Sequence, residues 1–546
     1  MSESDRSAVV RYHERTKHQY GRFAPSLGYL DWNTQPDPFR RYEGAEVVEM
    51  PIPQHDPPAS YDDLYRPGAI AARPVDSETV SGFLYYSLAL SAWKQHQQSR
   101  WALRVNPSSG NLHPIEGYLL CRDLPGTGAG LYHYAPREHA LERRAEISDA
   151  AWSRLSSAHP DVLFLVGMTA IPWRESWKYG ERAYRYCQHD AGHALAALRI
   201  AAALYGWRIH HQGGVGDDDL ASLLGIERED ARNEHEPELP VLLVTVTGSG
   251  SPSSSSISLP RLRADDLTWS GRANVLSPEH HPWPAIDEVA RSCRIDGEAF
   301  DTDWPSSIHG DAHRCAMAPE SAAAAGGIIR QRRSALAMDG QTTLARDVFW
   351  RALARTVPSL CPMPWDAIRW PVCAHLAITV HRVTGVTPGL YMLARDPEQI
   401  DDLRGAMRRE FAWQRVEGCP DALPFRLLAE GDYRATAARV SCEQDIAADG
   451  AFSLGMVVRF NEAIEKFGAP FYRHLFWETG MIGQVLYLES EAAGLRSTGI
   501  GCFFDDPVHD LLGLTVPRYQ SLYHFTVGGP VLDTRLVSEP AYPESR

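Results

Sequence analysis

Residues 178–225 and 466–513 align without a gap at a constant offset of 288, and 14 of the 48 aligned positions are identical. Glycines and charged residues dominate the identical positions, so a chance pairing of common apolar residues is a poor explanation. The identities are Lys178, Gly180, Tyr184, Arg185, Gly192, Leu198, Gly206, Arg208, Gly213, Asp217, Asp218, Leu223, Leu224 and Gly225, each with its partner 288 residues further on. The chain therefore contains one module twice, and such a duplication commonly replaces a homodimer with a site at its interface.

The composition is that of a soluble globular protein, with 23% charged and 44% hydrophobic residues in a chain of 546. Its formal net charge of −15 disfavours nucleic acid or an anionic membrane as the main partner. The charged N-terminus carries no secretory signal, and no apolar run approaches the ~20 residues of a membrane-spanning helix. The nine cysteines lack metal-ligand spacing, so we expect no metal site and a reducing cytoplasm as the location.

The repeat divides the chain into two large halves. A Ser-rich stretch, Ser249–Ser258, follows a strand-like apolar run and ends the first half. We expect an N-terminal domain at 1–250, a connector at 251–326 and a C-terminal domain at 327–546. We assign no chemistry to the connector or to residues 404–452.

Within the first copy, residues 189–207 carry apolar side chains at the spacing of a helix that is buried on several sides. Gly206 fits the position just after that helix, where a left-handed backbone suits glycine. The pairs Asp217–Asp218 and Asp505–Asp506 are expected to cap short helices that end at Gly225 and Gly513.

Three segments suggest chemistry. Residues 107–111 form a turn rich in potential donors, although a plain surface turn has the same composition. Guanidinium groups match phosphate geometry, so the cluster that opens the second module suits a phosphate monoester, although a solvated basic face is the alternative. Gly499 and Gly501 flank Ile500 and allow a flat ligand to approach the backbone closely. The first segment is Pro107, Ser108, Ser109, Gly110 and Asn111, and the second is Arg330, Arg332, Arg333 and Ser334.

Together these pieces resemble the FMN-dependent nitroreductase superfamily, in particular the SagB/ThcOx branch of peptide-heterocycle dehydrogenases. The pieces that match are RVNPSSGNLHP, WKYGERAYRY, RQRRSALAMDG and GIGCFFDDPVHDLLGL followed by YHFTVGGP. The resemblance covers nearly all of both halves. It implies an α+β fold made of two tandem nitroreductase-like domains, each an antiparallel sheet flanked by helices, which form an intrachain pseudo-dimer.

The resemblance also implies FMN bound where the two units meet. The Arg332–Ser334 segment would hold the phosphate and ribityl chain, and the Pro107–Asn111 turn would cover the isoalloxazine ring. A backbone amide around Gly499, Ile500 and Gly501 would lie near flavin N5, and Arg535 would add to the phosphate site. The turn exists in the first half alone and the arginine cluster in the second alone, so we expect one flavin per chain.

Lys178 and Tyr179 match the Lys-Tyr pair that the heterocycle dehydrogenases use to remove the second proton. A lysine acts as a base near neutral pH when burial or neighbouring cations lower its pKa. The repeat leaves a structural role open, because Lys466 repeats Lys178, whereas Phe467 replaces Tyr179 and lacks its hydroxyl.

The resemblance implies an FMN-dependent oxidoreductase that dehydrogenates a heterocycle or C–N bond of a peptide-derived or small-molecule substrate. Reduction of nitro compounds or quinones by NAD(P)H is an alternative, since fold does not fix reaction. A non-catalytic flavin-fold scaffold in a biosynthetic complex is a third.

Overall fold

The computed structural model describes residues 3–122, 128–248, 266–297, 323–514 and 517–542. The Ser-rich linker expected at Ser249–Ser258, the rest of that segment to residue 265, and residues 298–322 of the expected connector lie outside the described residues.

The first half is built on an eight-stranded sheet in which all paired neighbours run antiparallel. Along β8, Phe164, Val166 and Met168 face the core between the halves, whereas Leu165 faces a separate cluster on the other side. This alternation is the period of two that a strand buried on both faces requires. The strand order is β11 (Leu267–Trp269), β7 (Ala140–Ile147), β6 (Gly130–Ala135), β5 (Ile115–Cys121), β8 (Val162–Ala170), β10 (Leu239–Gly248) and β9 (Trp207–His211), and β2 (Glu46–Glu49) also pairs with β7.

The second half repeats this plan with a seven-stranded antiparallel sheet. Its edge strand β18 follows a long helix and pairs with the last long strand, as β9 does in the first half. The strand order is β15 (Gln414–Arg415), β16 (Phe425–Glu430), β14 (Gly389–Leu393), β13 (Ala374–Val380), β17 (Phe452–Arg459), β19 (Tyr519–Gly528) and β18 (Arg496–Ile500).

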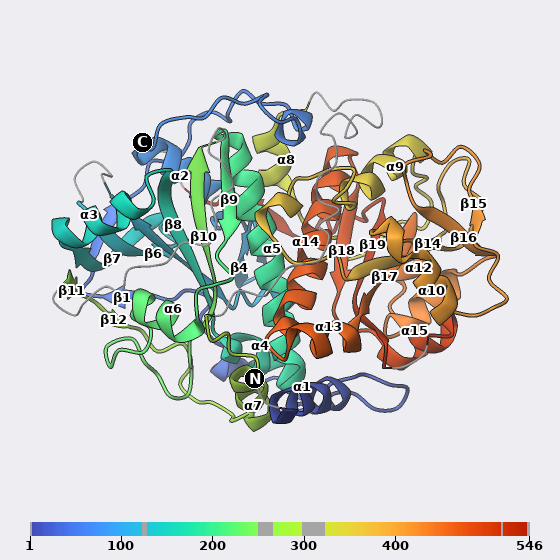
Figure 1. Cartoon of the computed structure of the whole chain (residues 1–546), viewed down its shortest axis with the longest axis horizontal. Helices are drawn as coiled ribbons and strands as arrows, with labels where there is room; N and C mark the ends of the chain where they lie inside the picture. The colour runs from blue at the N-terminus through green and yellow to red at the C-terminus, as the bar shows by residue number, and fades with distance from the viewer. Residues whose placement is uncertain (1–2, 123–127, 249–265, 298–322, 515–516, 543–546) are drawn as a thin grey trace.

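Two small sheets complete the fold. One pairs β1 (Tyr42–Glu43) with β12 (Arg272–Ala273), and the other has the order β20 (Val537–Glu539), β3 (Leu90–His96) and β4 (Ser99–Arg104). Because β20 pairs with β3, the C-terminal segment lies against the first half, where Figure 1 also places the C-terminus.

Helices flank both sheets. Those of the first half are α1 (Glu3–Arg15), α2 (Ser77–Tyr85), α3 (Asp149–Ala158), α4 (Pro172–Tyr179), α5 (Ala183–Leu204), α6 (Asp217–Leu224) and α7 (Pro284–Ser292). Those of the second half are α8 (Ala325–Gln331), α9 (Arg346–Arg355), α10 (Ile400–Ala406), α11 (Arg434–Val440), α12 (Ile446–Asp449), α13 (Phe460–Phe467), α14 (Phe471–Ala492) and α15 (Asp505–Leu512). None of the described helices is long and apolar enough to cross a membrane.

The helices α5 and α14 pack against each other between the two sheets (Figure 1). Gly192 and its repeat partner Gly480 lie where they cross. A Cβ on Gly192 would collide with the backbone of Trp477, and a Cβ on Gly480 would collide with the carbonyl oxygen of His189. The repeated glycine therefore allows the two helix backbones to approach each other closely.

A second repeated pair joins the halves reciprocally. Arg473 of α14 lies 2.7 Å from the carboxylate of Asp217 in the first half, and Arg185 of α5 lies 2.8 Å from that of Asp505 in the second. Arg185 and Arg473 are repeat partners, as are Asp217 and Asp505. This reciprocal pattern is that of the interface of a two-fold dimer, here formed within one chain.

The structure confirms the long helix and the glycines that end the helices, but it places the helix N-caps at other residues. Gly206, Gly225 and Gly513 have positive φ of 65°, 67° and 67° at helix ends, as expected. The expected N-caps are wrong, because Gly216 and Phe504 occupy the cap positions and Asp217 and Asp505 are the first helical residues. The buried arginines bind those carboxylates, and helical spacing does not reveal such a long-range partner.

Candidate functional site

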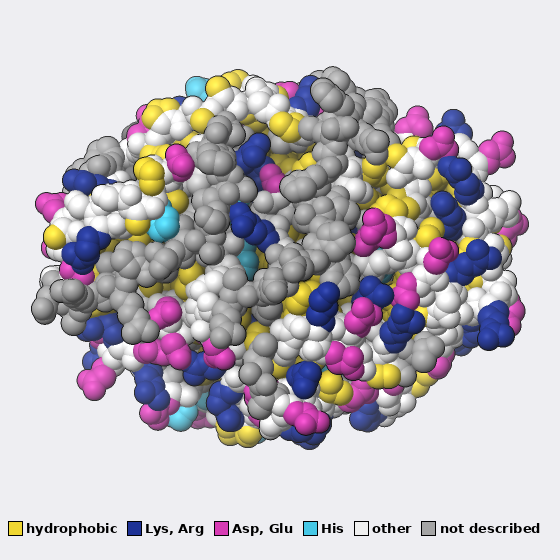
Figure 2. Space-filling view, in the orientation of Figure 1, with side chains coloured by type: hydrophobic (Ala, Val, Ile, Leu, Met, Phe, Trp, Pro, Cys, Tyr) yellow, Lys and Arg dark blue, Asp and Glu magenta, His cyan; other side chains and the backbone are white. Residues whose placement is uncertain are grey.

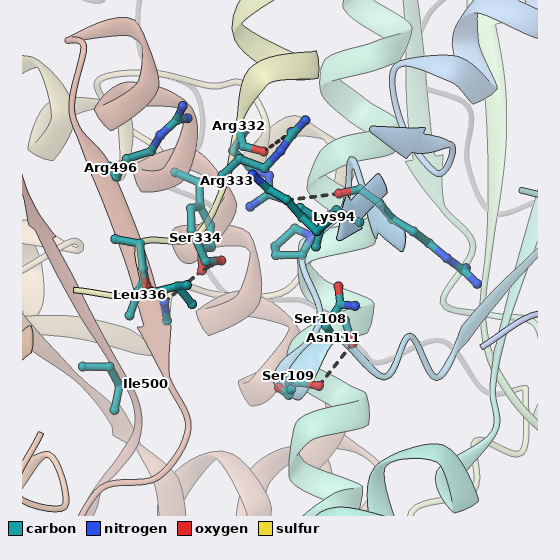
Figure 3. Close-up of a pocket in the computed structure, with 18 of the residues that line it drawn as sticks. Lys94, Ser108, Ser109, Asn111, Arg332, Arg333, Ser334, Leu336, Arg496 and Ile500 are labelled. Carbon is teal, nitrogen blue, oxygen red and sulfur yellow. Dashed lines mark hydrogen bonds between the residues drawn. The ribbon is translucent and has the colours of Figure 1, made fainter. Parts of the chain in front are cut away.

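A cavity of about 790 Å³ lies between the two halves. Small-molecule and cofactor sites typically have volumes of roughly 300–1,000 Å³. Figure 3 shows Ser108, Ser109 and Asn111 across the cavity from Ser334, Leu336 and Ile500. The predicted site residues that line it are Pro107, Ser108, Ser109, Gly110, Asn111 and Tyr179 from the first half, and Arg332, Arg333, Ser334, Gly499, Ile500 and Gly501 from the second.

Three predicted residues lie outside the lining. Arg330 donates to the carbonyl oxygens of Tyr85 and Leu90, at 3.1 and 2.6 Å, and its guanidinium lies over the Tyr85 ring. Lys178 ends α4 with its Nζ 5.2 Å from the ring centre of Tyr179. Arg535 is 76% exposed and pairs with Asp533, which itself lines the cavity.

The turn at Pro107–Asn111 is held against α5 by a buried carboxylate. Asp190 accepts hydrogen bonds from the backbone N and from Oγ of Ser109, at 3.1 and 3.2 Å. Gly110 has a φ of +58°, which favours glycine, and a Cβ there would lie 2.5 Å from the hydroxyl oxygen of Tyr179. The close contact with Tyr179 and the bonds from Ser109 fix the turn at the cavity wall.

Cations gather on the opposite wall. Burial lowers the pKa of Arg332 to about 10, and burial and neighbouring arginines lower that of Arg333 to about 9. Lys94 and Arg496 also line this wall, and Arg496 pairs with Glu491. These cations repel one another and are partly removed from water, so an anion bound in the cavity would stabilise them.

The arginine side chains are already positioned by the first half. Arg332 donates Nε to the carbonyl oxygen of Val105, at 3.0 Å, and Nη2 to that of Arg104, at 3.1 Å. Its remaining Nη1 is buried and has no hydrogen-bond partner among the described residues. Arg333 donates Nη2 to the carbonyl oxygen of Ser91, at 3.0 Å. A preorganised, incompletely satisfied cationic wall is what a phosphate site requires.

Strand β18 brings the glycine segment to the same cavity. The hydroxyl of Tyr487 lies 2.9 Å from Oγ of Ser334 and accepts the amide of Gly499 at 3.0 Å. A Cβ on Gly499 would collide with Tyr523, and one on Gly501 with Tyr186. Because the amide of Gly499 already donates to Tyr487, the amide of Ile500 or Gly501 would have to contact a ligand.

Two buried carboxylic acids stand behind the turn. Burial raises the pKa of Glu175 well above its usual range, and the charge of Asp190 adds to the effect. Burial also raises the pKa of Asp190 to about 7. Oγ of Ser108 donates to Glu175 at 3.4 Å, so the turn touches both acids. Asp190 lines the cavity and can exchange a proton near neutral pH.

Tyr179 stays protonated near neutral pH, unlike Asp190. Burial raises its pKa well above the usual value, with the neighbouring carboxyl of Glu175 adding to the rise. Tyr179 therefore keeps its proton and can donate a hydrogen bond into the cavity that it lines.

Sequence reasoning missed Lys94, Glu175, Asp190 and Arg496. Two of them carried a signal. Asp190 is the one acidic residue of a mostly apolar helix, and Arg496 is the repeat partner of Arg208. Lys94 and Glu175 gave none, because only the tertiary fold brings them to this place. No cluster of three or more potential metal ligands occurs in the described part of the chain.

Residues at the pseudo-symmetric counterpart of the cavity lining pack against one another. At the offset of 288, His474 corresponds to Tyr186, Glu478 to Asp190 and Gly499 to His211. The Trp370 ring lies 4.7 Å from that of His474 and 5.4 Å from that of His211, centre to centre. Arg395 pairs with Glu478. Aromatic packing and an internal ion pair thus involve three positions that correspond to cavity-lining residues.

On the face shown in Figure 2, the charged side chains of the described residues do not gather by sign. Figure 2 shows acidic and basic side chains interspersed over the displayed face.

Comparisons with known proteins agree with this architecture. Residues 391–529 match the model of the Nitroreductase family. A protein of Methanocaldococcus jannaschii named as a nitroreductase is 27% identical over 127 residues, which is 22% of this chain and 63% of that protein. The trifolitoxin-processing protein TfxB of Rhizobium leguminosarum bv. trifolii is 33% identical over 130 residues, which is 22% of this chain and 35% of that protein. The chain thus spans less than two thirds of the length of either relative.

The whole fold also has a solved counterpart. The crystal structure of an Anabaena variabilis protein assigned as a nitroreductase superposes with a TM-score of 0.69 at 22% identity, covering 96% of this chain and 99% of that one. The α+β fold with two antiparallel, helix-flanked sheets is therefore confirmed.

Proposed function

We propose that this chain, a nitroreductase-fold oxidoreductase with a nitroreductase-family domain at residues 391–529, uses one FMN held between its two halves. The observation that carries the proposal is the shared cavity, which brings the Arg332–Ser334 segment opposite the Pro107–Asn111 turn. These two segments come from different halves, and each lacks a counterpart in the other half.

The residues present fit FMN in three respects. Lys94, Arg332, Arg333 and Arg496 offer positive charge for a phosphate, and Arg332 has an unsatisfied buried Nη1. The tyrosines and the turn offer surfaces for a flat ring. The glycines of β18 let the backbone come close to that ring. Any role in the flavin site for the predicted residues Lys178, Arg330 and Arg535 would be exerted from outside the cavity lining.

The packing at the counterpart of the cavity lining supports a single flavin per chain. A second flavin would have to displace the buried Trp370 ring and break the Glu478–Arg395 pair, which is costly in an apolar interior. A measured ratio of two FMN per polypeptide would contradict this part of the proposal.

Bound FMN would supply hydride chemistry, and the chain's own residues would supply position and proton transfer. The cationic wall would bind the phosphate, and the turn pinned by Asp190 would limit the ring's movement. Removing a proton from a bound substrate requires a base whose pKa is near the working pH. Asp190 meets that requirement, whereas Tyr179, with its raised pKa, would orient the substrate by donating a hydrogen bond. The catalytic role of Lys178 and Tyr179, predicted from the sequence, stays a prediction.

For the substrate, we favour dehydrogenation of a heterocycle or C–N bond in a peptide-derived or small molecule. One sequence relative, TfxB, is named as a trifolitoxin-processing protein, which supports a peptide-derived substrate. The cavity also accommodates the alternative, reduction of nitro compounds or quinones by NAD(P)H. The location in the cytoplasm stays an expectation.

The test begins with the purified full chain and added FMN. Stoichiometric binding of one FMN, followed by slow or absent bleaching with NADPH under anaerobic conditions, would support the dehydrogenase. Rapid bleaching with NADPH, and reoxidation by a quinone, would instead establish the reductase. A colourless chain that rejects FMN would overturn both and leave the non-catalytic scaffold.

A further inference from the structure

A pair of cysteines lies at the edge of the cavity, and the site described above makes no use of either. Sγ of Cys442 and Sγ of Cys502 are 2.9 Å apart and hydrogen-bonded. Cys442 follows α11, whereas Cys502 lies between β18 and α15 and lines the cavity next to Gly501. Both side chains are partly exposed, so a small reagent can reach them.

The backbone around Cys442 adopts an uncommon conformation. Cys442 and Glu443 have consecutive positive φ angles of 55° and 58°, a region that side-chain-bearing residues rarely occupy. Two residues later, Gln444 donates Nε2 to the carbonyl oxygen of Cys502, at 3.0 Å. This hydrogen bond connects the strained loop to the loop of Cys502, and the two thiols lie next to each other across the two loops.

The two thiols differ in their affinity for a proton. The hydrogen bond to Cys502 and burial raise the pKa of Cys442. The hydrogen bond from Cys442, together with one from His18 and the charge of Arg182, lowers the pKa of Cys502 to about 5. The backbone amide of Ala24 donates to Nδ1 of His18, at 2.9 Å, which leaves Nε2 as the donor when His18 is neutral. Cys502 is therefore the stronger acid of the pair and the sulfur that more readily attacks a disulfide.

Further charged and titratable groups face Cys502 from each surrounding element. They are His18 after α1, Tyr179 at the end of α4, Arg182 before α5, Tyr186 in α5 and Asp505 in α15. Asp505 offsets part of the charge of Arg182, because the two lie 3.0 Å apart. Arg182 also donates Nη2 to the carbonyl oxygen of Gly501, at 3.1 Å, which fixes the guanidinium beside the Cys502 loop.

We propose that Cys442 and Cys502 form a redox-active dithiol that a low-molecular-weight disulfide oxidises to an intramolecular disulfide at the wall of the cavity. The proposal does not depend on the flavin. In the oxidised state, the disulfide links the α11–α12 loop covalently to the β18–α15 loop. These loops carry Gln444 and Gly501, which both line the cavity.

The exchange is balanced in two steps. The Cys502 thiolate attacks one sulfur of the small disulfide, forms a mixed disulfide and releases one thiolate. Cys442 then loses its proton and attacks Sγ of Cys502, which releases the second thiolate and closes the protein disulfide. Two protein sulfurs are oxidised, and the small disulfide is reduced to one thiol and one thiolate, because the proton of Cys442 passes to one of the two released thiolates.

The first test equilibrates the full chain, without added FMN, in mixtures of reduced and oxidised glutathione. We expect a cross-linked peptide containing Cys442 and Cys502, detected by mass spectrometry without reduction, that rises with the oxidised fraction and disappears with dithiothreitol. Cys442→Ser and Cys502→Ser remove it, whereas Cys419→Ser, at another partly exposed cysteine, leaves it unchanged. Absence of the cross-link in the wild-type chain at every ratio would overturn the proposal.

The second test needs no variant. Burial raises the pKa of Cys419 to about 11, so at pH 6 its thiolate is far scarcer than that of Cys502. Because a less basic thiolate is also a weaker nucleophile, iodoacetamide is expected to alkylate Cys502 only roughly 100-fold faster than Cys419. Equal rates at the two positions, read by peptide mapping of the folded wild-type chain, would contradict the thiolate on which the exchange depends. The Cys442→Ser variant is expected to shift the alkylation profile of Cys502 to higher pH.

Discussion

Arg332 and Val105 are 227 residues apart in the chain, yet Nε of the arginine donates to the carbonyl oxygen of the valine at 3.0 Å. Val105 lies two residues before the Pro107–Asn111 turn. This bond therefore ties the cationic segment of one half directly to the turn of the other. Any movement of the two halves that opened the cavity would break it and leave a buried guanidinium poorly paired.

The cationic wall predicts the affinity for FMN. Replacing Arg333 with Gln removes one charge from a cluster that, in our proposal, holds the phosphate. A charge-assisted hydrogen bond contributes roughly 1.5–3 kcal/mol, so we expect the dissociation constant to rise about 10- to 100-fold. Fluorescence titration with FMN measures it.

Arg434→Gln provides the matched control, because Arg434 is exposed and lies outside the cavity lining. It is expected to leave FMN affinity unchanged. Equal losses in both variants would indicate that overall charge, and not the local wall, determines binding. The melting temperature of each apoprotein checks that the fold is intact.

The helix crossing predicts the effect of added volume. Gly480→Ala places a methyl group against the backbone of α5, so we expect destabilisation of about 1–3 kcal/mol. Gly405→Ala in α10 meets no atom within 4 Å and is expected to stabilise the chain slightly, because alanine favours the helix. Urea unfolding compares the two, and a neutral Gly480→Ala would disprove the close crossing.

The raised pKa of Asp190 predicts a dependence of stability on pH. An acid whose pKa is higher in the folded state binds its proton more tightly there, so its contribution is fully present below the unfolded pKa of about 4. That contribution is lost as pH rises to about 7. Asp190→Asn removes the titration and keeps an oxygen that can accept from Ser109. Relative to wild type, the variant should gain stability between pH 5 and 7, by at most about 1.4 kcal/mol per pH unit.

Urea unfolding at pH 5, 6, 7 and 8 measures this difference. Asp219→Asn, at an exposed position on α6, controls for the exchange of an aspartate for an asparagine. A difference between Asp190→Asn and wild type that stays constant with pH would show that Asp190 ionises normally.

The reciprocal ion pairs predict a large cost when one partner is removed. Arg473→Met leaves the buried carboxylate of Asp217 without its cation, which is expected to destabilise the chain by roughly 3–5 kcal/mol. The exposed Arg434–Asp432 pair is the comparison, and Arg434→Met there should leave the unfolding midpoint unchanged. If Asp217→Leu combined with Arg473→Met fails to recover stability relative to Arg473→Met alone, the ion pair is not the cause.

The sequence by itself determined the duplication, the α+β class and the ends of several helices. A fixed offset with shared glycines and charges survives only where backbone geometry or a buried partner constrains a residue, as Gly192 and Gly206 illustrate. Burial patterns and glycine conformations are local properties, so they can be read along the chain.

The tertiary structure decided which residues meet. Asp217 and Asp505 read as helix caps in the sequence, yet each binds an arginine from the other half. Arg330 and Arg535 belong to segments that reach the cavity, but their side chains turn to other partners. Glu175 and Asp190 acquire their high pKa from burial beneath the turn, and Cys442 meets Cys502 across two loops. These relationships depend on long-range packing and desolvation, which no spacing of residues along the chain encodes.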